Sequence, residues 1–326
     1  MKILLSRTDR IGDLVLSTPA IATVRASFPQ AHVAIVTSSY NSVVMERNGD
    51  VDELLVLPEG ESAATYGARL KGYDIAIALA PRAADLRLVG ATRARVRVGY
   101  TYERRWFARL TAALCVNRTM ISEADPELCE RDPSRIVRHE VAQLLDLVAL
   151  AGAERRIVSL RLDVYDEDRA IARALPEGPI VLHVGRRWFT GGSTLAGTLA
   201  TVEDLGRLAP VVITCASDCD AEAAAFARGG AAAVLRGLPF HEWAAVLERA
   251  RAVVTVDTGA THVASAVGRP TLVAFEHRYF NLNSQEWSPY GVPHVLLRKP
   301  ARADESSLAR FRAEIVRGVE ELLDAA

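Results

Sequence analysis

A polar loop after the first apolar run carries side chains suited to acid–base chemistry. Residues 7–13 read Arg-Thr-Asp-Arg-Ile-Gly-Asp, between a strand expected at 2–6 and a helix expected at 14–27. As an N-cap of that helix, Asp13 would stabilise it by about 1 kcal/mol. The same carboxylate could take a proton from a hydroxyl nucleophile, and capping would fix its direction. Gly12 either lets the backbone approach a ligand closely or supplies a turn with positive φ.

This loop does not match the usual nucleotide-binding loops. It holds one glycine, so it has neither the G-x-G-x-x-G spacing of a dinucleotide fold nor the G-x-x-x-x-G-K-[ST] spacing of a phosphate loop. The pattern therefore disfavours an NAD-dependent enzyme and an NTPase.

A second polar cluster stands late in the chain, where an apolar strand at 252–256 opens into a helix expected at 258–267. Its members are Asp257, Thr258, Gly259, Thr261 and His262. The free backbone N–H groups of a helix N-terminus attract phosphate, and a histidine one turn in could donate to a phosphate or sugar oxygen. In the alternative interpretation, Asp257 caps the helix and His262 is a core histidine.

Arginines gather in one stretch of the first half, opposed by Asp85 and Glu103 alone. They are Arg82, Arg87, Arg93, Arg95, Arg97, Arg104, Arg105 and Arg109. If they face a ligand they suit a phosphorylated or acidic acceptor, and otherwise they form a solvated face. Trp106 and Phe107, beside them in the chain, could touch a lipid surface.

Neither acidic nor cysteine spacing indicates a metal centre. Residues 166–168 and 218–220 both spell D-x-D, but both stand at expected helix starts, where acidic residues are favoured anyway. The four cysteines form no C-x-x-C pair and have no His/Cys cluster to complete a zinc site. We therefore expect no metal and buried thiols in a reducing compartment.

Two α/β halves would position these loops. Apolar runs of strand length alternate with longer helical patterns, which is typical of parallel sheets covered by helices. The expected strands are 2–6, 33–37, 53–57, 74–79 and 95–99 in the first half, and 180–184, 211–215, 233–235, 252–256, 271–275 and 295–297 in the second. We expect the ligand cleft between the carboxyl ends of the two sheets.

The expected domains are residues 1–160, residues 161–303 and a C-terminal helix in 304–326. Its apolar positions repeat at helical spacing, so one face must be buried, and we expect it to pack back on the first domain. A hinge for closure of the cleft is expected in the linker at 152–168.

Chain length, net charge and hydropathy exclude further functional classes. The chain has 326 residues, with Lys+Arg 39 against Asp+Glu 40 and a net charge of −1, which excludes a polycation built for nucleic acid. No stretch approaches about 20 uncharged apolar residues, and the apolar run at the N-terminus is too short for a signal peptide. We expect a cytoplasmic protein.

Two motifs together resemble glycosyltransferase family 9, the ADP-heptose heptosyltransferases. They are R-x-x-x-x-G-D-x-x-x-x-x-P, ending at Pro19, and V-D-T-G-x-x-H at 256–262, followed by W-x-P-Y-G at 287–291. The resemblance implies two facing Rossmann-like domains (the GT-B fold), with acceptor on the first and sugar nucleotide on the second. It also implies inversion at the anomeric carbon, without a cofactor or an essential metal.

The resemblance assigns roles by matching positions. Asp13 takes the general-base position, and Asp257, Thr258, Gly259 and His262 take donor-binding positions, with Gly12 and Thr261 beside them. The acceptor, a lipopolysaccharide core or a related acidic or phosphorylated glycan or glycolipid, would meet Arg7, Arg10, Arg82, Arg104 and Arg105. Such an acceptor suggests peripheral contact with the cytoplasmic face of the inner membrane.

Two departures from the family pattern leave the substrates open. Members usually carry a lysine after the first strand of the second domain, whereas this chain has Arg186 and Arg187 there; Glu276-His277-Arg278 replaces the usual G-P-T. Asp220 or Glu222 could bind the ribose, or could be helix-start acids. Alternatives are therefore another nucleotide sugar, an acceptor outside lipopolysaccharide, or a non-catalytic protein that binds sugar nucleotides.

Overall fold

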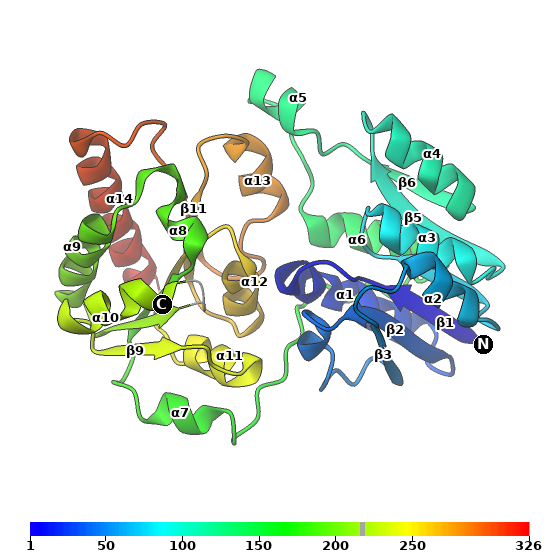
Figure 1. Ribbon diagram of the computed structural model, residues 1–326, viewed down its shortest axis with the longest axis horizontal. Coiled ribbons are helices and arrows are strands. Elements are labelled where there is room, and N and C mark those ends of the chain that lie inside the picture. The colour runs from blue at the N-terminus through cyan, green and yellow to red at the C-terminus, as the bar shows by residue number, and fades with distance from the viewer. Residues whose placement is uncertain (216–218, 326) are drawn as a thin grey trace. The chain divides into compact units, whose positions relative to one another are not determined.

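The chain divides into two units, Met1–Leu162 and Asp163–Ala326, each built on one six-stranded parallel sheet (Figure 1). This computed structural model describes residues 1–215 and 219–325. The units are described one at a time below.

The first sheet has the strand order β3-β2-β1-β4-β5-β6. Its strands are β1 (Lys2–Ser6), β2 (His32–Ser38), β3 (Glu53–Leu57), β4 (Ile75–Ala78), β5 (Val96–Tyr102) and β6 (Arg118–Ser122). The central strands are apolar along their length because helices cover both faces, and every residue of β4 is buried. At the edge, β6 buries only Ser122.

Helices cover both faces of this sheet. They are α1 (Ile11–Ser27), α2 (Ala63–Arg69), α3 (Ala83–Ala91), α4 (Trp106–Cys115), α5 (Pro126–Arg131) and α6 (Glu140–Ala149), with a 3₁₀ turn at Ser42–Val44. The helices α1 and α6 pack together, and α2, α3 and α4 pack against one another. The α1 sequence is buried without interruption from Gly12 to Val24.

The second sheet repeats the same connectivity, in the order β12-β11-β10-β7-β8-β9. Its strands are β7 (Ile180–Val184), β8 (Val211–Cys215), β9 (Ala233–Arg236), β10 (Ala252–Val256), β11 (Thr271–Phe275) and β12 (His294–Arg298). In both units the first strand lies at the centre, and later strands add on either side of it. This arrangement confirms the predicted α/β class of doubly wound, Rossmann-like sheets.

The helices of the second unit are α7 (Arg169–Arg173), α8 (Arg186–Phe189), α9 (Leu195–Gly206), α10 (Asp220–Arg228), α11 (Phe240–Glu248), α12 (Gly259–Ala266), α13 (Phe280–Glu286) and α14 (Glu305–Asp324), with a 3₁₀ turn at Thr190–Gly192. Within the described stretches, no helix has the length and apolar composition needed to span a bilayer.

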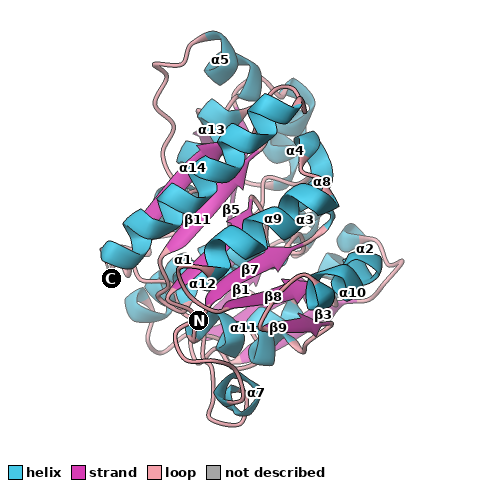
Figure 2. Cartoon of the chain, turned by 90° about the vertical axis from the view of Figure 1, so that its left-hand side faces the viewer, coloured by secondary structure: helices cyan, strands magenta, loops and turns pink. Residues whose placement is uncertain are grey.

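The predicted docking of the C-terminal helix on the first domain is wrong. The apolar face of α14 lies in the core of the second unit, where Phe311, Ile315, Val319 and Leu322 are buried with Val254 and other residues of the sheet. Figure 2 shows α14 along this sheet, next to α9. Helical periodicity had shown that one face is buried, but it carries no information on which surface covers that face.

Local predictions also need correction. The sequence also predicts a helix at 39–47, which is reduced to the 3₁₀ turn at Ser42–Val44, and no element was predicted where α4, α5, β6, α8 and α13 lie. Its strand boundaries otherwise agree to within a few residues, since each central strand is a separate apolar run.

Candidate functional site

In the first unit, strand order reverses between β1 and β4, so the chain leaves these neighbours toward opposite sides. Such a reversal at the carboxyl ends of parallel strands is where α/β proteins bind ligands. The loop that follows β1 holds Arg7 and Arg10, and the first turn of α1 holds Asp13, which places the predicted catalytic motif at this point.

Asp13 lies in the first turn of α1, and the N-cap interpretation is wrong. The helix begins at Ile11, its N-cap residue is Arg10, and no side chain caps it. The Asp13 carboxylate is instead held from both sides, by Arg10 Nε at 2.7 Å from Oδ2 and by Arg7 Nη2 at 3.4 Å from Oδ1. Gly12 is a helical residue beside it, in no positive-φ turn.

Arg7 is a buried organising residue of this site. Its side chain is 2% exposed, and its guanidinium also contacts Asp9 Oδ1 at 2.9 Å and Glu140 Oε1 at 3.1 Å. Burial alone would lower the Arg7 pKa, but Asp9, Tyr100, Asp13 and Glu140 together hold it well above its usual value. Arg7 is thus placed to orient Asp13, and the predicted direct contact with the acceptor does not suit its burial.

Glu140 and Tyr100 complete this cluster, and sequence reasoning missed both. Tyr100 Oη donates to Glu140 Oε1 at 2.8 Å, and burial raises the pKa of both groups. Glu140 is the first residue of α6 and lies 133 residues from Arg7. The available signal was an acidic residue at a helix start, a position too common to indicate a functional partner.

Asp85 holds the loop between β1 and α1 in place through hydrogen bonds. Its carboxylate accepts hydrogen bonds from Ser6 Oγ at 2.6 Å and from the Thr8 backbone N–H at 3.1 Å, and burial raises its pKa. This acid therefore anchors the loop between β1 and α1 rather than balancing the neighbouring arginines.

The predicted acceptor arginines separate into two groups. Arg82 reaches the loop, with Nη1 3.4 Å from Thr8 O, and Arg10 is exposed while holding Asp13. Arg104 and Arg105 lie at the start of α4 instead, where Arg104 faces Asp125 at 4.0 Å and Arg105 covers the Tyr102 ring. The contacts of these last two do not include the Asp13 cluster.

In the second unit, the sheet reverses between β7 and β10, and the structure distinguishes the two candidate arginines there. Arg187 reaches Asp257, with Nη1 donating to the backbone carbonyl and Nη2 3.5 Å from Oδ2. The Arg187 side chain is 44% exposed. Arg187 is therefore a cation associated with the start of α12, and Arg186, the other candidate, is also exposed.

The predicted phosphate-binding helix start is present, and α12 begins at Gly259 with Thr258 as its N-cap residue. The Thr261 hydroxyl donates to Val256 O at 3.1 Å and is fully buried, so it closes the turn between β10 and α12. His262 is also buried, one turn in. Asp257 pairs with Arg187, whereas the alternative interpretation had made it a helix cap.

A buried lysine braces the segment that carries Arg187, and sequence reasoning missed it. Lys299 Nζ donates to Arg187 O at 2.6 Å and Thr190 O at 2.9 Å, and it pairs with Glu276 Oε1 at 2.8 Å. Thr190 Oγ1 also donates to Glu276 Oε1, at 2.7 Å. Gly191 packs so closely that an added Cβ would lie 2.8 Å from Glu276 Oε2.

Lys299 and Glu276 each stabilise the charged form of the other. Burial lowers the pKa of Lys299, while the Glu276 carboxylate works in the opposite direction. Burial would also raise the pKa of Glu276, but hydrogen bonds from Lys299 and Thr190 outweigh it and keep that pKa below its usual value. Glu276 is the residue that replaces the expected G-P-T, so this departure forms an ion pair under the Arg187 segment.

The ribose candidates are less defined. Glu222 is half-buried in α10, and Asp220 begins that helix with its side chain outside the described part; Asp218 also lies outside the described residues. Asp168, in the other D-x-D, accepts from the Tyr165 backbone N–H at 2.8 Å. Within 1–215 and 219–325, no group of three or more His, Cys, Asp or Glu side chains could hold a metal ion.

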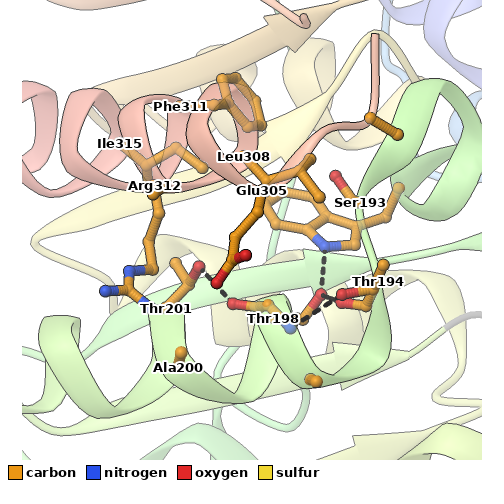
Figure 3. Close-up of a pocket in the computed structure, with 15 residues that line it drawn as sticks. Ser193, Thr194, Thr198, Ala200, Thr201, Glu305, Leu308, Phe311, Arg312 and Ile315 are labelled. Carbon is orange, nitrogen blue, oxygen red and sulfur yellow. Dashed lines mark hydrogen bonds between the residues drawn. The ribbon is translucent and has the colours of Figure 1, made fainter.

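A cavity of about 560 Å³ lies between α9 and α14, away from these groups (Figure 3). Trp188 lines it and donates from Nε1 to Thr198 Oγ1 at 2.9 Å, which anchors α8 to α9. Neither Asp257 nor any residue from Thr258 to His262 lines this cavity.

Residues 207–307 match the family model described as glycosyltransferase family 9 (heptosyltransferase). This match includes V-D-T-G-x-x-H and W-x-P-Y-G, while the first motif lies outside it. The matched segment spans less than a third of the chain and lies within the second unit.

Several solved structures are similar in fold to nearly the whole of this chain. A family 9 glycosyltransferase from Veillonella parvula has a TM-score of 0.80 at 18% identity, covering 100% of this chain and 97% of that one. The ADP-heptose lps heptosyltransferase II of E. coli has a TM-score of 0.75 at 17% identity, covering 99% and 98%. E. coli heptosyltransferase WaaC, solved with ADP-2-deoxy-2-fluoro heptose, has a TM-score of 0.69 at 18% identity, covering 98% and 99%.

These similarities confirm the GT-B type of fold for this chain, since all of them extend over nearly the full length of both chains. Comparison with curated proteins by sequence gives no match.

Proposed function

We propose that this enzyme transfers heptose from ADP-heptose to a hydroxyl of a lipopolysaccharide core or a related acceptor, with inversion and without a cofactor or an essential metal. Support comes from the family match and from two similar structures, one an ADP-heptose lps heptosyltransferase and one solved with an ADP-heptose analogue.

The observation that carries the proposal is the Asp13 carboxylate, which is held between Arg7 and Arg10 and is 7% exposed. In a single displacement, the acceptor oxygen bonds to the anomeric carbon as the bond from that carbon to the diphosphate oxygen breaks. The electron pair leaves with ADP, and the proton of the hydroxyl passes to Asp13. Two arginines hold this carboxylate in one direction, as a general base requires.

The leaving diphosphate would be bound by the second unit. Arg187 offers an exposed guanidinium beside the first N–H groups of α12, and both kinds of group stabilise developing negative charge. Thr258 and Gly259 are at this helix start, and Glu222 is our candidate for the ribose.

The acceptor is proposed to be acidic or phosphorylated. Arg10 and Arg82 are exposed beside the Asp13 loop and offer the charge that such a group requires. We also propose that the enzyme works at the cytoplasmic face of the inner membrane, in peripheral contact with it, because a core acceptor is a glycolipid.

A screen of ADP-, GDP- and UDP-sugars by thermal shift tests the donor, because a ligand at 100 times its Kd stabilises by about 2.7 kcal/mol. We expect ADP-heptose to give the largest shift and to yield a glycosylated acceptor whose new linkage has inverted anomeric configuration. A preference for a UDP-sugar would overturn the ADP-heptose assignment.

A second candidate is the same reaction with another nucleotide sugar, and the Lys299–Glu276 pair favours it. Glu276 stands where the family pattern has G-P-T, and Lys299 joins it to the Arg187 backbone, so the pair changes the surroundings of the proposed donor site. In the same screen this candidate predicts turnover with a different sugar nucleotide, whereas binding without product on any acceptor would indicate the non-catalytic alternative.

A further inference from the structure

Helix α4 presents its large apolar side chains to the outside. Trp106 is 63% exposed, Phe107 68%, Leu110 54% and Leu114 77%, whereas the small Ala112 is buried. Amphipathic helices of globular proteins turn their large apolar side chains toward the core. Because α4 does the reverse, its outer face is suited to contact something other than this unit's own core.

The four side chains form one continuous apolar face. At about 100° per residue, they span an arc of about 100° on the helix surface. The Trp106 and Phe107 rings are stacked, with centroids 3.5 Å apart. A contiguous exposed apolar patch of this kind marks an interaction surface, unlike isolated exposed apolar residues.

Basic side chains border this face. Arg104 and Arg105 directly precede α4 and Arg109 lies within it, all three exposed, and the helix itself contains no acidic residue. Each has a modest tether: Arg104 Nε is 4.0 Å from Asp125 Oδ2, Arg105 lies over Tyr102 at 4.9 Å, and Arg109 Nη1 is 3.4 Å from Glu103 O. Their charges remain accessible on the surface of the helix.

We infer that α4 is a membrane-docking helix that binds an anionic lipid surface. Trp, Phe and Leu on one face with arginines beside them are the pattern of helices that lie in the headgroup region. Each arginine near an anionic surface strengthens binding roughly fivefold. A second copy docked symmetrically through this face would bring arginines close to their own copies, so charge favours lipid over self-association.

This inference deepens the proposed function by naming the surface that would approach a glycolipid acceptor, and it rests on that function for the acceptor alone. Binding to vesicles without any substrate tests it separately. If vesicles are bound but no sugar is transferred, the proposed function fails alone. If sugar is transferred to a short water-soluble acceptor but vesicles are not bound, the inference fails alone.

The experiment is flotation of the full chain with vesicles of phosphatidylcholine, or of phosphatidylcholine and phosphatidylglycerol in equal parts. We expect binding to the anionic vesicles, at least a tenfold loss for the double variant Trp106→Gln/Phe107→Gln, and a smaller loss for Arg105→Gln/Arg109→Gln. Val158→Gln, at another exposed apolar residue, and Arg131→Gln, at another exposed arginine, are the matched controls and should bind as the parent does. Circular dichroism and melting temperature verify that each variant is folded.

Three outcomes would overturn the inference. The first is anionic-vesicle binding that the Trp106 and Phe107 substitutions leave unchanged. The second is equal binding to both vesicle types, which removes the role of the arginines. The third is absence of vesicle binding, and if the parent then sediments as a dimer that the double variant abolishes, the face serves a second copy.

Discussion

The two strand-end sites secure their charged groups in opposite ways. In the first unit the arginine is buried: Arg7 is 2% exposed and contacts the carboxylates of Asp9, Asp13 and Glu140. In the second unit the arginine is half-exposed, and what is buried is the lysine beneath it, which holds the backbone at Arg187 and Thr190.

This difference follows from the two proposed tasks. A general base must keep one direction, so Arg7, one of its two arginine partners, is fixed and removed from water. A cation that binds a leaving diphosphate must remain accessible to it, so rigidity is supplied to its backbone instead. Substitutions in each unit test whether its buried cation, Arg7 or Lys299, acts by orienting a neighbouring group.

The largest effect is expected at Asp13. Asp13→Asn should lower turnover by about 10²- to 10⁴-fold, the range for loss of a general base, without weakening donor binding. Asp9→Asn is the matched control, because Asp9 contacts the same arginine, and its loss should be below about tenfold. Steady-state rates and donor titration provide the measurements; comparable losses in the two variants would show that the whole cluster is merely structural.

The next largest effect is expected for Lys299→Met, on the stability of the fold. Removing one partner of a buried ion pair leaves the other uncompensated, and with Glu276 partly exposed we expect a loss of about 3 kcal/mol in unfolding free energy. Lys71→Met, at an exposed lysine, should change it by less than about 0.5 kcal/mol. Urea unfolding measures both variants.

The affinity of the Lys299→Met variant for the donor tests whether Lys299 acts through Arg187. If Lys299 works by holding the Arg187 segment, its substitution should weaken the donor in the parent but add nothing in an Arg187→Ala background. Additive losses in the double variant would mean that Lys299 acts independently of Arg187.

Much of the fold could be predicted from the sequence because its central strands are buried on both faces and therefore appear as separate apolar runs. The edge strand Arg118–Ser122 has no such run, since only Ser122 is buried, and it was missed. Helix α4 was missed because its large apolar residues face outward. The docking partner of α14 is a tertiary choice that its own periodicity cannot encode.

The candidate sites show the same limit. Arg7, Arg10 and Asp13 are local in sequence, so one motif brought them to notice together. Their partner Glu140 is 133 residues away from Arg7, and Lys299 is 112 residues from Arg187. These contacts depend on which strand ends become neighbours, so no spacing in the sequence could have indicated them.

Arg187→Ala is expected to have an intermediate effect that separates the two arginines after β7. Loss of a charge-assisted contact to the donor should weaken its binding by roughly 10- to 30-fold. Arg186→Ala should weaken it by less than about threefold, because the Asp257 contact belongs to Arg187. Calorimetric titration with ADP measures both; a reversed order would assign the diphosphate to Arg186.

The smallest effect is a pH dependence at Glu276. Its pKa in the folded protein lies below the ordinary 4.5, so its ionised form stabilises the fold above that pH, and this contribution is lost as pH falls through the folded-state pKa. Glu276→Gln keeps an acceptor for Lys299 and Thr190 but removes the charge, so we expect a loss of about 1 kcal/mol at neutral pH. The gap between parent and variant should narrow as the pH falls below 4.5 and close once the pH is below the folded-state pKa. It should also be absent in a Lys299→Met background, where the pairing charge is missing. Urea midpoints across this pH range measure it, and a gap that persists in acid would show that the Gln side chain packs poorly and that charge is not what stabilises the segment.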